Sequence, residues 1–182
     1  MARPVKGEMI VRGALLVWVL VVTLVLLLVF PTAQAWPALL SAVVFFLLGN
    51  DPARIPQIFV GGATGLVLAA LFGLALGALV PAIGVGPALA ACFAVVLTLI
   101  IVGGAWAPMA LNNVTFAYLT VATISIATMG EHLLGWAAML LLGGGVLVGG
   151  CALLMKALLA AGEKKDEGGA PPASARSEGA RR

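Results

Sequence analysis

The chain carries very little charge along most of its length. Between Gly13 and Met155 only three side chains are charged, namely Asp51, Arg54 and Glu131. A soluble domain covers its surface with Lys, Glu, Asp and Arg, so this stretch cannot form one. Hydrophobic residues make up 63% of the chain, above the roughly 45–50% of typical soluble proteins. Both features predict an integral membrane protein whose main partner is the lipid bilayer.

Residues that carry catalytic or metal chemistry are also scarce. The sequence has one His and two Cys, and the spacing of Cys92 and Cys151 matches no metal or redox motif. It contains no P-loop and no nucleophile elbow, and its membrane region has no pair of carboxylates at helical spacing. We therefore expect no enzymatic activity, no cofactor and no metal. The net charge of +3 does not indicate nucleic-acid binding, because nine of the ten Lys and Arg lie at the two ends.

Long apolar runs predict six transmembrane α-helices. A bilayer core is about 30 Å thick and needs roughly 20 apolar residues per helix. The runs are continuously apolar, without the alternation of a membrane-spanning strand. The predicted spans are about 12–30, 36–49, 57–80, 86–106, 112–129 and 133–156. The predicted breaks are Pro31, the Asn50-Asp51-Pro52 turn, Pro81 with Gly84 and Gly86, Pro108, and Gly130-Glu131-His132.

Basic residues flank the apolar region and predict its orientation. Arg3, Lys6 and Arg12 precede the first span, and Lys156, Lys164 and Lys165 follow the last. The positive-inside rule places both termini in the cytoplasm. The predicted organisation is a cytoplasmic N-terminus over 1–11, a membrane domain over 12–160 and a cytoplasmic tail over 161–182. One alternative is a signal peptide over 1–35, although its apolar run is longer than the usual ~7–15 residues.

The tail has a composition typical of disorder. Residues 163–182 are mostly Gly, Pro, Ser, Ala and charged residues, and such a segment cannot bury enough apolar surface to fold. Its mixed-sign run at 163–167 favours a solvated helix end over a lipid-binding patch.

The two halves of the membrane region share weak features. Trp36 is followed by Phe45 and Phe46, and Trp106 is followed by Phe116 ten residues later. The third helix of each half is rich in glycine. Three spans per half predict a 3+3 inverted repeat, and the short spans 36–49 and 112–129 at matching positions point to a binding site. The alternatives are a chance pattern in a biased composition, and a bilayer that thins around the short helices.

Small residues recur every four positions in the third span. They are Gly61, Gly65, Ala69, Gly73 and Gly77, and the last span carries Gly135, Gly143, Gly145 and Gly149. Such faces allow helix backbones to approach closely. We therefore predict tight helix packing. It is either packing within one chain or packing between the chains of a homodimer or higher oligomer.

The fifth span is the most polar. At 3.6 residues per turn, one face of about 100° collects five residues: Asn112, Asn113, Phe116, Thr120 and Thr123. This stripe predicts a path for a solute, with Arg54 near its cytoplasmic mouth. The alternative is that the hydroxyls bond to their own helix and the Asn pair caps its start. Asp51 before Pro52 is likewise a helix-start signal.

Several soft motifs resemble a known family. They are Trp36 through Phe46, the turn from Asn50 to Arg54, the Gly61-Gly62-Ala63-Thr64-Gly65 segment and Asn113-Val114-Thr115-Phe116. In these the chain resembles the YcdZ-like family of small bacterial inner-membrane proteins. More distantly it resembles the membrane half of fusaric-acid-resistance-type proteins and plant malate channels. The resemblance implies a six-helix inner-membrane bundle with a transport-related role, and it supplies no site residues.

We therefore predict a membrane channel or carrier for a small polar solute or organic anion. The alternative is a non-transporting scaffold or assembly subunit that packs through its glycine-rich faces.

Overall fold

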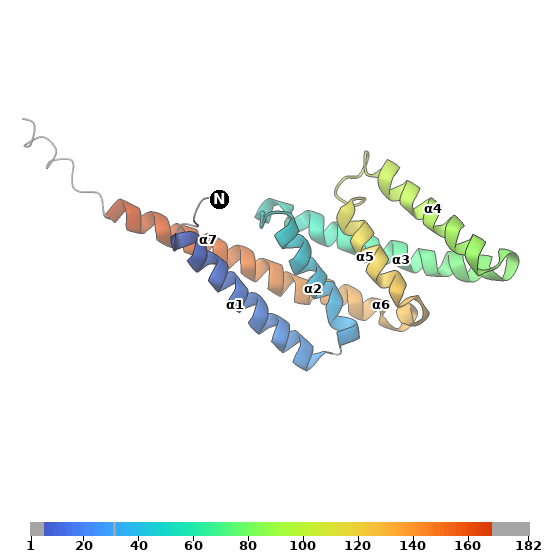
Figure 1. Ribbon diagram of the computed structural model, residues 1–182, viewed down its shortest axis with the longest axis horizontal. Coiled ribbons are helices and arrows are strands. Elements are labelled where there is room, and N and C mark those ends of the chain that lie inside the picture. The colour runs from blue at the N-terminus through green and yellow to red at the C-terminus, as the bar shows by residue number, and fades with distance from the viewer. Residues whose placement is uncertain (1–5, 31, 169–182) are drawn as a thin grey trace, which may run out of the picture.

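The computed structural model describes residues 6–30 and 32–168, and this part of the chain is helical without any strand (Figure 1). The α-helices are α1 (Lys6–Val29), α2 (Thr32–Leu47), α3 (Ile55–Ile83), α4 (Val85–Gly103), α5 (Asn113–Ile124), α6 (Met129–Ala138) and α7 (Gly144–Gly168). Short 3-10 turns occupy Pro52–Arg54 and Ile126–Thr128. A π-helical segment, Met139–Gly143, joins α6 to α7 in one rod.

Four helical segments are long and apolar enough to cross a membrane. They are Met9–Val29, Pro52–Ile83, Val85–Gly103 and Ile126–Ala161. At 1.5 Å per residue, the 16 residues of α2 span about 24 Å and the 12 residues of α5 about 18 Å, less than the ~30 Å bilayer core. The predicted all-helical membrane protein is confirmed at this level, and six crossings stay a prediction.

The helix boundaries agree with several predicted breaks and correct others. The Asn50 turn and the chain around Pro108 are non-helical, and Gly84 turns the chain between α3 and α4 with a φ of 82°. The predicted break at Gly130–His132 is wrong, because α6 already begins at Met129 and the interruption lies at Ser125–Thr128. α7 continues to Gly168, which agrees with the helix end favoured at 163–167 and corrects the predicted disorder over that run. Pro31 and residues 169–182 lie outside the described part.

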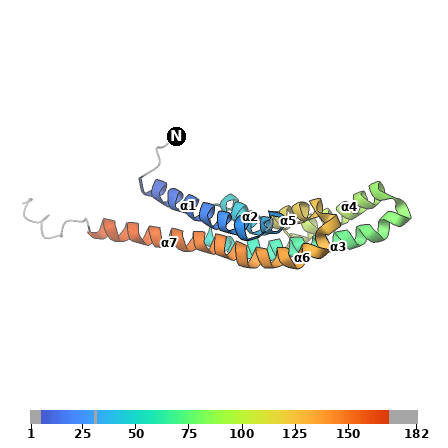
Figure 2. The same cartoon turned by 90° about the horizontal axis from the view of Figure 1, so that it is seen from below.

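Successive helices reverse direction along one elongated body. α1, α3 and α5 run one way, and α2, α4 and the α6–α7 rod run the other way (Figures 1 and 2). α1 packs mainly on α7 and α4 mainly on α3. The two short helices lie between these pairs, where α2 contacts α7 and the π-helical segment while α5 contacts α3.

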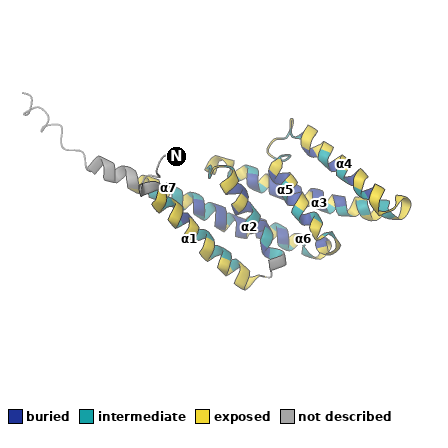
Figure 3. Ribbon diagram, in the orientation of Figure 1, coloured by how far each residue is buried: buried dark blue, intermediate teal, exposed yellow. Residues whose placement is uncertain are grey.

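Many of the buried residues lie where the short helices cross the long ones, and others lie between α3 and α4 (Figure 3). The largest fully buried side chains include Trp136, Tyr118, Phe45 and Ile58. The outer faces carry large apolar side chains, such as Leu28 at 77% exposure and Leu134 at 85%. An apolar exterior of this kind fits lipid rather than water.

The glycine ladder packs within the chain over half of its length. Added methyl groups at Gly61 and Gly65 would press against α5, and Ala69 is fully buried. Gly73 has only ordinary contacts with Ile126, and a methyl group at Gly77 would meet no atom within 4 Å.

In the last helical rod, Gly143 lies against Ala38 of α2, whereas Gly149 faces open space. The ladder of α3 therefore packs on α5 rather than on the glycines of this rod. Gly144 against Ser41 and Gly150 against the Trp18 ring are close contacts that the sequence did not single out.

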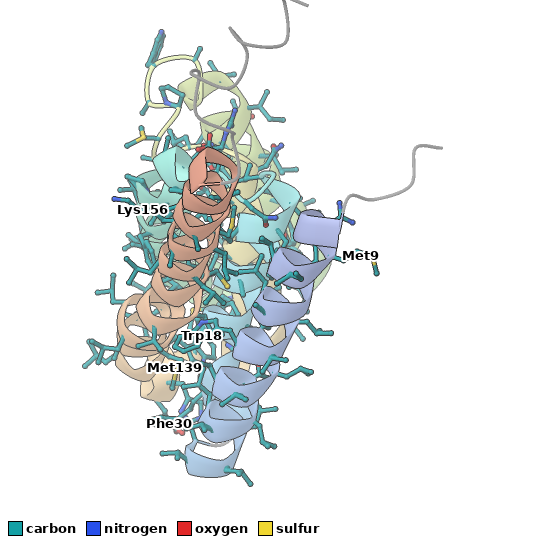
Figure 4. The ribbon with its side chains drawn as sticks, turned by 90° about the vertical axis from the view of Figure 1, so that its left-hand side faces the viewer. Met9, Trp18, Phe30, Met139 and Lys156 are labelled. Carbon is teal, nitrogen blue, oxygen red and sulfur yellow. The ribbon has the colours of Figure 1, made fainter. Side chains whose placement is uncertain are left out.

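Trp18 fastens α1 to α7. Its Nε1 atom donates a hydrogen bond to the Leu147 carbonyl oxygen at 3.3 Å, and its ring lies over Gly150. Figure 4 shows Trp18 between the two helices, with Phe30 and Met139 at the far end of the same gap. Met9 and Lys156 point away from this contact. The helices are therefore antiparallel partners although they stand at opposite ends of the sequence.

Candidate functional site

The predicted polar stripe lies on the outer side of α5. Asn113, Phe116 and Thr120 are exposed, and Asn112 and Thr123 are half-buried. The buried face of α5 is instead formed by Val114, Thr115, Tyr118, Leu119 and Ala122. Thr120 donates its hydroxyl to the Phe116 carbonyl at 2.8 Å, and Thr123 donates to the Thr120 carbonyl at 2.8 Å. These hydroxyls therefore bond within their own helix, as the alternative interpretation expects.

Asn112 acts as the cap of α5. Its Oδ1 atom accepts from the backbone N–H of Val114 at 2.8 Å, and its Nδ2 atom donates to the carbonyls of Pro108 and Met109 at 2.9 Å each. Thr115 completes a capping box by accepting from the Asn112 N–H. Such a box satisfies donors that a helix start leaves unpaired. The amide that was predicted to line a path is thus engaged in holding the helix start.

Arg54 lies at the turn before α3 and beside Asp51. Its Nε atom is 3.7 Å from the Asp51 carboxylate, and both side chains are about half exposed, at 53% and 47%. Asp51 also accepts the Ala53 N–H at 2.9 Å and so caps the 3-10 turn, as its position before Pro52 predicts. An exposed pair of this kind contributes little to stability.

A buried set of polar groups lies at the crossing of α2 and α5. The Tyr118 hydroxyl donates to the Pro37 carbonyl at 2.7 Å and also interacts with the Ser41 side chain. Ser41 donates its own hydroxyl to the Ala38 carbonyl at 2.6 Å. Ser41 and Tyr118 are fully buried. We call Pro37, Ser41 and Tyr118 the central polar cluster.

Glycines of the long helices make room for this cluster. A methyl group at Gly144 would lie 2.6 Å from the Ser41 hydroxyl oxygen, and one at Gly62 would lie 3.2 Å from the Tyr118 ring. The π-helical segment ends at Gly143, directly before this contact. Such π segments inside α-helices are frequent at functional sites. Pro37 lies inside α2, and a proline within a helix removes one backbone hydrogen bond.

Aromatic rings connect the cluster to the start of α6. The ring centroids of Trp36 and Tyr118 are 5.7 Å apart, and those of Trp36 and Trp136 are 5.4 Å apart in an edge-to-face arrangement. Trp136 in turn lies 6.2 Å from the half-buried ring of His132. Offset and edge-to-face pairs of this kind are favourable, so the rings form a packed column from His132 to Tyr118.

Two larger pockets lie to either side of this column. One, of about 430 Å³, runs between α1 and the α6–α7 rod and has Gln34 as its polar residue among apolar ones. The other, of about 620 Å³, has Gly73 and Gly77 on one side and Ile126 and Met129 on the other. The residues of the predicted stripe line neither pocket. The described residues also include no group of three or more His, Cys, Asp or Glu that fits a metal ion.

Sequence reasoning did not find the central polar cluster. Pro37 and Ser41 lie on α2 and Tyr118 lies on α5, so the cluster forms only where two helices of different halves meet. The signals that were available are a proline inside an apolar run and the only Tyr of the chain. Comparisons with family models, curated proteins and solved structures found no match. The functional argument therefore depends on the geometry alone.

Proposed function

We propose that this chain is a membrane transport protein, a channel or carrier for a small polar solute or organic anion. In this proposal it is built from two inverted halves of three helices each, and the solute binds at the central polar cluster where the halves meet. The single observation that carries the proposal is the matched packing of the two short helices, α2 and α5.

Each short helix packs on the long glycine-containing helix of the other half. α5 runs parallel to α3, since Gly61 lies near Val114, Gly65 near Tyr118 and Gly73 near Ile126. α2 runs parallel to the last rod in the same way, since Ala38 lies near Gly143 and Ser41 near Gly144.

The outer helices repeat the pattern, with α1 on α7 and α4 on α3. Exchanging α1, α2 and α3 for α4, α5 and the α6–α7 rod therefore reproduces every one of these contacts. This is what an inverted repeat requires.

The alternating directions of the helices support six crossings. α1 and α3 run the same way (Figure 1), so the chain must return to its starting side through α2 before α3 begins. The same argument applies to α5, which separates α4 from the parallel last rod. We propose that α2 and α5 cross together with the turns that extend them, in a bilayer thinned to match. Both basic ends then face the cytoplasm of a bacterial inner membrane.

Buried polar groups support the choice of site. Among the described residues the buried polar side chains are Ser41 on α2 and Thr115 on α5, one in each half, and Tyr118 adds a buried hydroxyl that bonds from α5 to α2. Polar groups inside a membrane are costly and tend to mark a substrate path. Short or interrupted helices at matching positions are the usual walls of such a site. Hydroxyls and carbonyls suit a neutral or weakly charged polar solute.

The test is flux into proteoliposomes that contain the purified full chain. The probes are radiolabelled malate as the organic anion and glycerol, followed by vesicle swelling, as the neutral solute. Ser41→Ala and Tyr118→Phe remove hydroxyls of the cluster and keep its volume. Thr120→Val is the matched control, because it removes an outward hydroxyl from the same helix as Tyr118.

The outcomes separate three cases. The proposal expects flux to fall about five- to tenfold in the cluster variants, as for a lost hydrogen bond of ~1–1.5 kcal/mol, with little change in Thr120→Val. Loss of flux in Thr120→Val with normal flux in Tyr118→Phe would mean that the solute passes along the outer stripe of α5 instead of the central polar cluster. Absence of flux for both probes in the unaltered, correctly folded chain would contradict the proposal for these two solute classes.

The outward stripe favours one second candidate, a membrane assembly subunit. Asn113 and Thr120 are exposed on an otherwise apolar exterior, and polar side chains on such a face can hydrogen-bond across to another helix. A scaffold would form a defined oligomer that Asn113→Leu weakens, and it would show no flux in either form. Cross-linking in native membranes measures this directly.

A further inference from the structure

Two backbone hydrogen bonds cap the C-terminal end of α2. The Gly49 N–H donates to the Phe46 carbonyl and the Asn50 N–H donates to the Phe45 carbonyl, both at 3.1 Å. Gly49 has a φ of 79° and Asn50 a φ of 61°. This pair of bonds defines a Schellman motif, with Gly49 in its left-handed position and Asn50 directly after it.

Asn50 departs from what this motif usually contains. The residue after the left-handed glycine is commonly apolar, because it packs back on the last turn of the helix. Here it is an amide, and its Oδ1 atom is buried with no hydrogen-bond partner among the described residues. A buried polar atom without a partner costs free energy and calls for an explanation, such as a bound molecule. Asn50 is also the only described non-glycine residue with a positive φ.

A pocket opens beside this amide. It measures about 340 Å³ and is lined by Asn50 and Phe46 from the end of α2 and by Arg12, Leu15, Leu16 and Val19 from the start of α1. Its polar groups, Arg12 and Asn50, are followed by four apolar side chains that continue into the membrane region. The pocket therefore offers one cationic group and one amide at its mouth and an apolar wall behind them.

We propose that this pocket binds an anionic phospholipid, with its phosphate held by Arg12 and the Asn50 amide. The guanidinium group has five N–H donors, which suffice for a phosphate in addition to the interaction that Arg12 makes within the chain. Rotation of the Asn50 amide by about 180° exchanges its oxygen for its NH₂ group, which can then donate to the phosphate. Leu16, Val19 and Phe46 then contact the first methylene groups of the acyl chains.

The positive charge of the pocket favours anionic over zwitterionic lipid headgroups. Arg12 is its only charged residue among those described, and none of these lining residues offers a carboxylate to the ammonium group of a zwitterionic headgroup. The position at the basic end of α1 matches the cytoplasmic side, where basic pockets between helices bind anionic headgroups. This inference does not depend on transport, because it uses neither the central polar cluster nor solute flux.

Native mass spectrometry of the detergent-purified full chain tests it. The chain is titrated with phosphatidylglycerol and, separately, with phosphatidylcholine of the same acyl chains. Arg12→Gln removes the cation, and Asn50→Gly removes the amide while keeping a residue that adopts positive φ readily. The matched control is Arg54→Gln, because Arg54 lies at the turn just beyond Asn50 and does not line the pocket.

We expect phosphatidylglycerol to bind more tightly than phosphatidylcholine. Arg12→Gln should weaken its binding about ten- to a hundredfold and Asn50→Gly about two- to tenfold, as for charged and neutral hydrogen bonds. Arg54→Gln should change it by less than about twofold. Size-exclusion chromatography and circular dichroism establish that each variant is folded.

Three results would overturn the inference. Equal losses in Arg12→Gln and Arg54→Gln would mean that the lipid follows general basic charge rather than this pocket. Equal binding of the two lipids would remove the role of headgroup charge. Displacement of the lipid by millimolar inorganic phosphate would identify the pocket as a site for the free anion.

Discussion

The contact between α3 and α5 gives the sharpest test of the fold, because two glycines of one ladder differ in their surroundings. A methyl group at Gly65 would lie 2.6 Å from both the Thr115 carbonyl oxygen and the Tyr118 Cβ atom. A methyl group at Gly77, three turns along the same helix, would meet nothing within 4 Å. Gly65→Ala and Gly77→Ala therefore make the same chemical change in opposite environments.

The size of the effect follows from the distances. Favourable contacts between carbon atoms lie at about 3.5–4.0 Å, so α5 must move away from α3 by about 1 Å to admit the Gly65→Ala methyl group. The obstructing atoms belong to the backbone and to a Cβ, so no side-chain rotation relieves the overlap. A gap of ~0.5–1 Å loses a quarter to a half of each dispersion contact, and overpacking of this kind costs about 1–3 kcal/mol.

The assay is the free energy of unfolding in mixed detergent micelles, from an SDS titration followed by circular dichroism. Each variant gains a similar helix preference of ~1 kcal/mol over glycine, so the difference between the two isolates the steric cost. We expect Gly65→Ala to be less stable than Gly77→Ala by about 1–3 kcal/mol. Equal stabilities, within the ~0.5 kcal/mol to which independent changes add, would refute the packing of α3 on α5.

Three further predictions use the same titration. Tyr118→Phe loses the hydrogen bond to the Pro37 carbonyl and should cost about 0.6–1.7 kcal/mol, as for hydrogen bonds between membrane helices. Gly150→Ala places a methyl group into the Trp18 ring, so it should cost about 1–3 kcal/mol and much less in a Trp18→Leu background; equal costs in both would disprove the contact. Thr120→Val removes an exposed hydroxyl that bonds only within α5, and its effect should stay below about 0.5 kcal/mol.

The positions of the helices could be predicted from the sequence because local signals mark them. Continuous apolar runs predicted the approximate positions of most helices, and Asp51 before Pro52 and Asn112 before α5 cap their helices as their residue types predict. The break predicted at Gly130 was wrong, and the reason is also local. Glycine only weakens a helix, and there the helix continues through it.

The pairing of the helices could not be predicted. Glycines at Gly61 and Gly65 correctly indicated close packing, but most side chains of every helix are apolar, and lipid is as apolar as they are. No pattern in the sequence therefore says that α3 meets α5 and that α1 meets α7. The specific contacts depend on single residues, such as Trp18 over Gly150.

The candidate site could not be predicted from the sequence either. Polarity along one helix pointed to Asn113, Thr120 and their neighbours, whereas the buried hydroxyls are Ser41 on α2 and Thr115 and Tyr118 on the other face of α5. Thr and Ser bond to carbonyls of their own helix in a membrane, so a polar stripe does not by itself reveal which face is buried. Tyr118 differs because its hydroxyl reaches Pro37, 81 positions earlier in the chain.

The pairing of α1 with α7 also bears on how the protein is made. Trp18 can form its contact only after the ribosome has synthesised Leu147, whose carbonyl accepts the hydrogen bond, and Gly150, over which the ring packs. Until then α1 lacks its main packing partner, although it has already been synthesised. Docking of α1 is thus a late event that follows synthesis of α7, whereas α3 can already pack on α4 and α5. A polypeptide that stops before the last helix leaves α1 without this contact.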